Sequence, residues 1–108
     1  MALYMTQFSY TPEAWAALVK NPEDRSAAAK ALLKKAGGRL LHTYYSFGEY
    51  DGLIIFEAPD EATATAPLLA AISKGHIKAT KTTVLFTVEA AVEAMSKAGG
   101  LSYEAPKG

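Results

Sequence analysis

The chain has 108 residues and a mass of 11.5 kDa, which suffices for one domain and is too short for two. Apolar residues make up 50% and charged residues 20%, a composition typical of a folded protein rather than a disordered one. The 11 Lys and Arg balance the 11 Asp and Glu, which argues against a protein that coats nucleic acid. Cysteine is absent, so disulfides, thiolate metal sites and a cysteine nucleophile are excluded.

The N-terminal third predicts one strand and a helical region. Ala2–Ser9 is short, apolar and aromatic, as strands are. Thr11-Pro12 is a helix start, because a hydroxyl cap precedes a proline at the first helical position. Asn21-Pro22 repeats this pattern, Ala27–Lys35 favours helix, and Gly37-Gly38 ends it. The region therefore predicts two helices, or one helix kinked near Pro22.

A hairpin follows. Arg39–Phe47 and Gly52–Ala58 are rich in β-branched, apolar and aromatic residues and predict two strands. The four residues Gly48-Glu49-Tyr50-Asp51 lie between them and predict a turn.

The C-terminal half predicts a helix, a strand and a last helix. A helix from about Asp60 to Ser73 contains Pro67, which predicts a kink or a break. Ile77–Phe86 predicts the fourth strand, and Val88–Lys97 predicts an amphipathic helix ended by Gly99-Gly100. We expect a single domain over residues 1–98 and an irregular tail over residues 99–108.

The element order βαββαβ, with an extra C-terminal helix, defines the fold class. Two interleaved βαβ units with right-handed crossovers give a four-stranded antiparallel sheet with helices on one face. The sequence thus predicts a ferredoxin-like α+β domain with the strand order 4-1-3-2.

The second face of this sheet also carries apolar residues. Leu53, Ile54, Ile55 and Phe56 are consecutive, whereas a sheet with one wet face alternates apolar and polar residues. Since the helices cover one face, the other needs a cover of its own. One cover is the same face of a second copy, which gives a homodimer whose two sheets pack face to face into a barrel-like body and permits higher oligomers. The alternative is a monomer in which the C-terminal helix folds back over that face.

The stretch from Tyr50 to Asp60, YDGLIIFEAPD, with Gly48 before it and Gly37-Gly38-Arg39-Leu40 upstream, resembles the GYD-domain family. The resemblance covers roughly residues 3–95 and implies a ferredoxin-like fold with no established activity. By analogy it implies a relation to dimeric α/β-barrel proteins, which include cofactor-free monooxygenases. Pro67, His42 and the glycine-ended tail depart from the usual family pattern.

The turn offers the first candidate site. Gly48 permits a positive φ, and Asp51 can accept a hydrogen bond from a nearby backbone N–H group, as in an Asx-turn. The functional interpretation is that Tyr50 and Asp51 line the mouth of a pocket, where they bind a polar group or orient a water.

His42 offers the second candidate. If two or four residues connect the strands, His42 lies opposite Glu57 and Tyr44 lies opposite Ile55. A His–Glu pair beside a tyrosine would suit acid–base chemistry, so His42 and Asp51 are the catalytic candidates. A solvated edge-strand histidine paired with a carboxylate is the structural alternative, and a loop of another length removes the pairing.

Two functional hypotheses follow from these candidates. The first is a homo-oligomeric interaction module, or one that binds a small apolar or aromatic ligand. The second is a cofactor-free oxygenase or isomerase in which His42, Tyr44 and Asp51 position the substrate and move protons. The ligand-binding candidates are the aromatic residues of the predicted strands and the polar residues of the hairpin: Tyr4, Phe8, His42, Tyr44, Tyr50, Asp51, Phe56 and Glu57.

Other site types find no support in the sequence. The two histidines, His42 and His76, lack metal-binding spacing, and we expect no metal and no cofactor. Every apolar run is shorter than a transmembrane span needs, and Met1–Tyr10 lacks the basic start of an export signal. We therefore expect a cytoplasmic protein without nucleic-acid or membrane partners.

Overall fold

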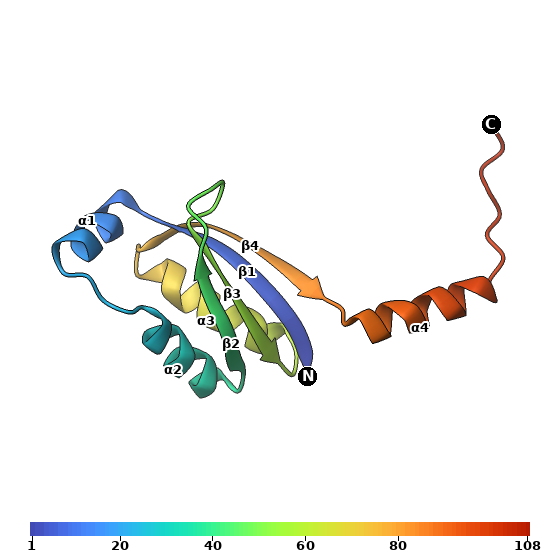
Figure 1. Cartoon of the computed structure of the whole chain (residues 1–108), viewed down its shortest axis with the longest axis horizontal. Helices are drawn as coiled ribbons and strands as arrows, with labels where there is room; N and C mark the ends of the chain where they lie inside the picture. The colour runs from blue at the N-terminus through green and yellow to red at the C-terminus, as the bar shows by residue number, and fades with distance from the viewer.

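The computed structural model describes all residues from 1 to 108 and shows a four-stranded sheet with helices on one face (Figure 1). The elements in chain order are β1 (Ala2–Tyr10), α1 (Pro12–Lys20), α2 (Ser26–Ala36), β2 (Arg39–Tyr45), β3 (Gly52–Ala58), α3 (Glu61–Ser73), β4 (Ile77–Leu85) and α4 (Val88–Gly99). The strands lie in the order β2-β3-β1-β4, and every neighbouring pair is antiparallel. This is the predicted order 4-1-3-2 read from the other edge, so the ferredoxin-like α+β fold is confirmed.

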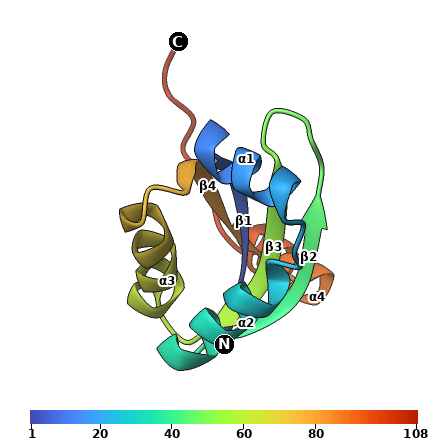
Figure 2. The same ribbon diagram turned by 90° about the vertical axis from the view of Figure 1, so that its left-hand side faces the viewer.

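The first crossover consists of two separate helices, α1 and α2, which follow one another along one side of the molecule (Figure 2). Thr11 caps α1 as predicted, because its hydroxyl accepts the backbone N–H of Ala14. The second predicted start at Asn21 is wrong: Asn21 ends α1, and its backbone N–H donates to the carbonyl of Ala17. The next helix begins only at Ser26, whose backbone N–H donates to the Asp24 carboxylate at 2.9 Å.

The second crossover helix, α3, runs from Glu61 to Ser73 with Pro67 inside it, so of the predicted kink or break the break is wrong. The Asp60 carboxylate accepts the backbone N–H of Thr63 at 2.7 Å and fixes the start of the helix. Pro67 is buried beside Ala64, so its ring contributes apolar burial against the sheet. That burial offsets the backbone hydrogen bond that proline cannot donate.

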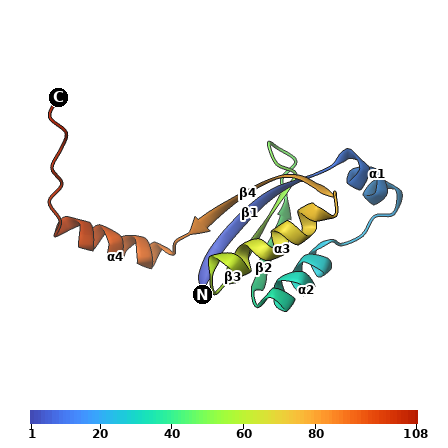
Figure 3. The ribbon, with the colours of Figure 1, turned by 180° about the vertical axis from the view of Figure 1, so that it is seen from behind.

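The core lies between the sheet and the helices α2 and α3, which cover the same face (Figure 3). Tyr4, Phe8 and Tyr10 alternate along β1 and are buried on this covered face. Phe56 is 1% exposed and stacks on Tyr4 with ring centroids 5.4 Å apart. The alternation on β1 and β3 therefore directs one set of side chains into the core.

The other set of strand side chains forms what we call the open face. The registers place these residues on it: Leu3, Met5, Gln7, Arg39, His42, Tyr44, Leu53, Ile55, Glu57, Lys81, Thr83 and Leu85. No helix lies over this face, because α4 leads away from the end of β4 (Figure 1). The alternative in which the C-terminal helix folds back over the sheet is therefore not what the chain adopts.

Helix α4 buries none of its residues. Val88, Val92 and Met95 lie one helical turn apart and are 80%, 55% and 68% exposed. Residues 101–108 beyond it have no regular secondary structure. None of the helices has the length and apolar character that crossing a membrane requires.

Candidate functional site

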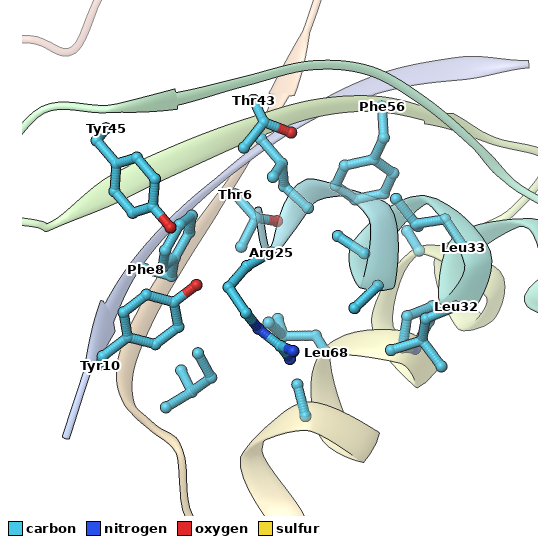
Figure 4. A pocket seen from close by; sticks show the side chains of 17 residues that line it. Thr6, Phe8, Tyr10, Arg25, Leu32, Leu33, Thr43, Tyr45, Phe56 and Leu68 are labelled. Carbon is cyan, nitrogen blue, oxygen red and sulfur yellow. The ribbon is translucent and has the colours of Figure 1, made fainter. Parts of the chain in front are cut away.

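A cavity of about 170 Å³ lies between the covered face and the helices α2 and α3, and we call it the inner cavity (Figure 4). Of its 17 lining residues, 13 are hydrophobic, so its walls favour an apolar occupant. Phe8 and Phe56 contribute from the sheet, Leu32 and Leu33 from α2, and Leu68 from α3.

Two threonines interrupt the apolar wall. The hydroxyl of Thr6 is hydrogen-bonded to that of Thr82 at 2.8 Å, so it is already satisfied. The hydroxyl of Thr43 is buried and has no hydrogen-bond partner. A buried hydroxyl left unpaired costs about 1–3 kcal/mol, so Thr43 is the lining group with most to gain from a polar ligand atom.

Two tyrosines and an arginine form the polar end of the inner cavity. Figure 4 shows the hydroxyls of Tyr10 and Tyr45 pointing toward one another, with Arg25 extending across the cavity beside them. Burial, followed by the neighbouring Tyr45 hydroxyl, raises the pKa of Tyr10 above its ordinary value. Arg25 donates from Nη1 to the Glu23 carboxylate at 2.8 Å. Its guanidinium carries further N–H groups, since arginine has five donors in all.

A second, wider hollow of about 620 Å³ lies next to the first, and we call it the outer cleft. Both hollows are lined by Tyr10, Arg25, Leu32, Ala71 and Ile77. Arg25 therefore stands where the inner cavity meets the outer cleft.

The structure divides the sequence-predicted ligand residues between the two faces of the sheet. Phe8 and Phe56 line the inner cavity, and Tyr4 packs against Phe56 without lining it. His42 and Tyr44 lie on the open face, where their rings stack with centroids 6.0 Å apart. The predicted set therefore does not form one site.

The predicted pairing of His42 with Glu57 is wrong. Tyr45 pairs with Gly52, so residues 46–51 connect the strands instead of the expected four residues. This register places His42 opposite Ile55, and an irregularity between Leu40 and His42 then shifts the partners of the residues that precede it. Glu57 lies opposite Arg39 instead, and the two side chains form an ion pair at 3.1 Å.

Tyr44 is displaced by the same change of register. It lies opposite Leu53 rather than Ile55, and its side chain is 56% exposed. Neither Tyr44 nor His42 lines the inner cavity or the outer cleft.

Asp51 joins three elements. Its Oδ2 accepts the backbone N–H of Tyr10 and the indole N–H of Trp15, each at 2.9 Å. The expected acceptor role is thus present, but the donors come from β1 and α1 rather than from a local Asx-turn. Gly52 beside it permits close packing, since a Cβ there would lie 2.7 Å from the ring of Phe8.

The rest of the turn also differs from the prediction. The residue with a positive φ is Phe47, at 49°, and not Gly48. Tyr50 contributes its backbone carbonyl, which accepts the Ser46 hydroxyl at 2.9 Å. Neither Tyr50 nor Asp51 lines the inner cavity, so the structure does not place them at its wall.

Sequence reasoning missed five polar residues that line the inner cavity: Thr6, Tyr10, Arg25, Thr43 and Tyr45. Alternation offered a signal for Tyr10, because extending the first strand by one residue places it on the face of Tyr4 and Phe8. Arg25 lies in the irregular connection between two helices, where no periodicity predicts its direction.

The fold places the chain in the class of ferredoxin-like α+β domains, and solved structures of low identity share that fold. MtbAldR matches with a TM-score of 0.56 and 12% sequence identity. The match covers 80% of this chain and 52% of MtbAldR. A transcriptional regulator of Neisseria meningitidis in complex with L-Met matches with a TM-score of 0.51 and 12% sequence identity. The match covers 81% of this chain and 51% of the regulator. The chain thus spans about half the length of these two proteins. A hypothetical protein from Pyrococcus horikoshii matches with a TM-score of 0.50 and 15% sequence identity. The match covers 81% of this chain and 92% of that protein.

Within this class the chain belongs to the GYD domain family, whose pattern matches residues 4–95. A relative from Thermus thermophilus is 31% identical over 78 residues, which is 72% of this chain and 82% of the relative. That relative is named "Glutamine synthetase and cystathionine beta-lyase binding protein". The resemblance seen in the YDGLIIFEAPD stretch is therefore confirmed.

Proposed function

We propose that this protein is a binding module that holds a small apolar or aromatic ligand between its sheet and its helices. The inner cavity is the observation that carries the proposal. An apolar cavity of about 150 Å³ is large enough to stay dry and bind benzene. The inner cavity has about 170 Å³ and mostly hydrophobic walls, so it suits a ligand built on one ring.

The ionisable groups at the cavity support binding rather than proton transfer. The raised pKa of Tyr10 keeps its hydroxyl protonated at neutral pH, and an arginine stays protonated as well. Both groups donate hydrogen bonds, and neither is a base there. The alternative, a cofactor-free oxygenase or isomerase, relies on His42, Tyr44 and Asp51. Two of these lie on the open face, and Asp51 is engaged with Trp15 and Tyr10.

We propose that the open face is the surface where two copies meet, in a homodimer that packs sheet against sheet. Leu53 and Ile55 on β3, Leu3 and Met5 on β1, and Leu85 on β4 give this face an apolar centre. Contiguous apolar surface of this kind favours association. The same patch on both copies is self-complementary about a twofold axis.

The name of the Thermus relative supports a role in interactions more generally, because it describes a protein that binds two enzymes. Val88, Val92 and Met95 on α4 offer exposed apolar side chains for a protein partner. Under this proposal the domain joins a ligand site and an interaction surface in one small chain.

Benzene titration followed by methyl NMR tests the cavity. We expect saturable shifts for the methyl groups of Ile54, Leu32 and Leu68, which line the inner cavity, and none for Leu53 on the open face. Ala71→Leu places extra volume at the cavity wall and should abolish the shifts. Absence of saturable shifts in the wild-type protein would overturn the proposal.

The matched control for that variant is Ala66→Leu. Ala66 is exposed on the same helix and lines neither hollow, so benzene should bind this variant as it binds the wild-type protein. Equal loss of binding in both variants would mean that α3 itself was disturbed, and the wild-type titration would then decide.

A further inference from the structure

We propose that the inner cavity and the outer cleft form one site for a small amphipathic anion, whose ring fills the cavity while its carboxylate pairs with Arg25. This inference rests on the proposed function, because it assigns a chemical class to the ligand of the same cavity. The argument rests on the position of Arg25, on the charges around the cleft and on the unpaired hydroxyl of Thr43.

Arg25 is the charged residue that both hollows share. On one side of it lie hydrophobic side chains such as Leu68, and on the other lies the wider cleft. A ligand whose apolar part occupies the inner cavity must therefore have its other end near the guanidinium. Since a guanidinium matches a carboxylate in shape and charge, that end is most favourably a carboxylate.

The charges of the outer cleft point the same way. Arg25 and Lys74 are cationic, and Glu23 is the single carboxylate among the cleft residues. Glu23 engages Nη1 of Arg25 and the Tyr10 hydroxyl lies beside the guanidinium, but arginine has five N–H donors, so others can donate to a ligand. The excess of positive charge would attract an anion and disfavour a cation of the same size.

Thr43 supplies the second, independent observation. Its hydroxyl lies in the wall of the inner cavity, is buried, and has no hydrogen-bond partner. Buried polar groups in folded proteins are nearly always paired, so an unpaired hydroxyl at a cavity wall points to a ligand atom as its partner. The expected ligand thus has an apolar ring with one polar atom that pairs with Thr43, and an anionic group at Arg25.

The test compares benzoate with benzyl alcohol, a neutral compound of similar size, by calorimetric titration. In the wild-type protein benzoate should bind more tightly than benzyl alcohol. Arg25→Gln should weaken benzoate binding about tenfold, a modest value for a charge-assisted hydrogen bond because the Arg25 side chain is 46% exposed. Benzyl alcohol should bind this variant as it binds the wild-type protein.

Lys30→Gln is the matched control, because it removes one positive charge from an exposed position on α2 outside both hollows. Benzoate should bind it as it binds the wild-type protein. Arg25→Lys keeps the charge and should fall between the wild-type protein and Arg25→Gln, which covers the case in which the glutamine variant does not fold.

Two results would overturn the inference while leaving the proposed function in place. The first is that benzyl alcohol binds the wild-type protein as tightly as benzoate does. The second is that Arg25→Gln and Lys30→Gln weaken benzoate binding equally. If benzene also fails to bind the wild-type protein, the proposed function falls and the inference falls with it.

Discussion

Along β3 the two faces of the sheet differ in cover but not in apolar character. On β3, Ile54 and Phe56 lie under the helices, and Leu53 and Ile55 lie on the open face. The covered face buries Phe56 almost completely, whereas Ile55 stays half-buried. A run of consecutive apolar residues on a strand therefore indicates that both faces of the sheet are covered, and the helices of this chain cover one of them.

The largest effect should come from Phe56→Ala, because it removes a buried ring from the core and leaves a cavity. We expect a loss of about 3–5 kcal/mol in the free energy of unfolding, at any protein concentration. Urea denaturation measures it. If the alanine variant does not fold, Phe56→Leu should show a smaller loss of the same kind.

The matched substitution on the open face is Ile55→Ala. Its cost should be small in dilute protein and should grow with concentration, since binding of a second copy adds stability by mass action. A cost that is the same at every concentration would show that Ile55 acts within one chain.

The next effect in size should come from Ile55→Lys, which places a charge at the centre of the open face. Burying an unpaired ammonium between two apolar sheets is unfavourable, so the variant should be monomeric at concentrations where the wild-type protein is dimeric. Light scattering measures the mass. Ala66→Lys, at an exposed position on α3, should keep the wild-type mass.

A smaller loss is expected from Asp51→Ala, which leaves the indole N–H of Trp15 and the backbone N–H of Tyr10 without their acceptor. We expect a loss of about 1–3 kcal/mol in the free energy of unfolding. The emission of Trp15, the single tryptophan of the chain, should change with it. Glu49 is exposed in the same loop, so Glu49→Ala should change neither the free energy of unfolding nor the Trp15 emission. An Asp51→Ala variant as stable as the wild-type protein would contradict the role of Asp51.

The smallest effect concerns pH and the polar end of the cavity. Because the pKa of Tyr10 is raised on folding, the unfolded chain loses this proton first as the pH rises above about 10. The contribution of the protonated Tyr10 to the free energy of unfolding is therefore fully present below about pH 10 and is lost as the pH rises above it. Tyr10→Phe should make the alkaline fall in stability shallower, by at most about 1.4 kcal/mol per pH unit. Tyr103→Phe, in the exposed tail, should leave the fall unchanged.

The fold was predictable because its signals are local and repeated. The strands alternate or run apolar, Thr11 caps α1, and glycines follow α2, so the element order and strand order came from the sequence. The errors lie where tertiary contacts decide. Asn21 ends α1 instead of starting the next helix, because the connection between the two helices is longer than expected. Pro67 is tolerated within α3 because it is buried against the core.

The candidate site was predictable only in part. Phe8 and Phe56 could be placed on strands, and both line the inner cavity. His42 could not be placed, because its pairing depends on the length of the loop between β2 and β3, which no local pattern sets. Arg25 reaches the cavity from a connection between helices, a position that only the tertiary structure defines.

The mass of the wild-type protein in solution, measured by light scattering over a range of concentrations, tests the central claim most directly. The account predicts that the open face is covered by a second copy, so the main species should have a mass of about 23 kDa, twice the 11.5 kDa of the chain, or a multiple of that dimer. A single species of 11.5 kDa at every concentration would contradict it.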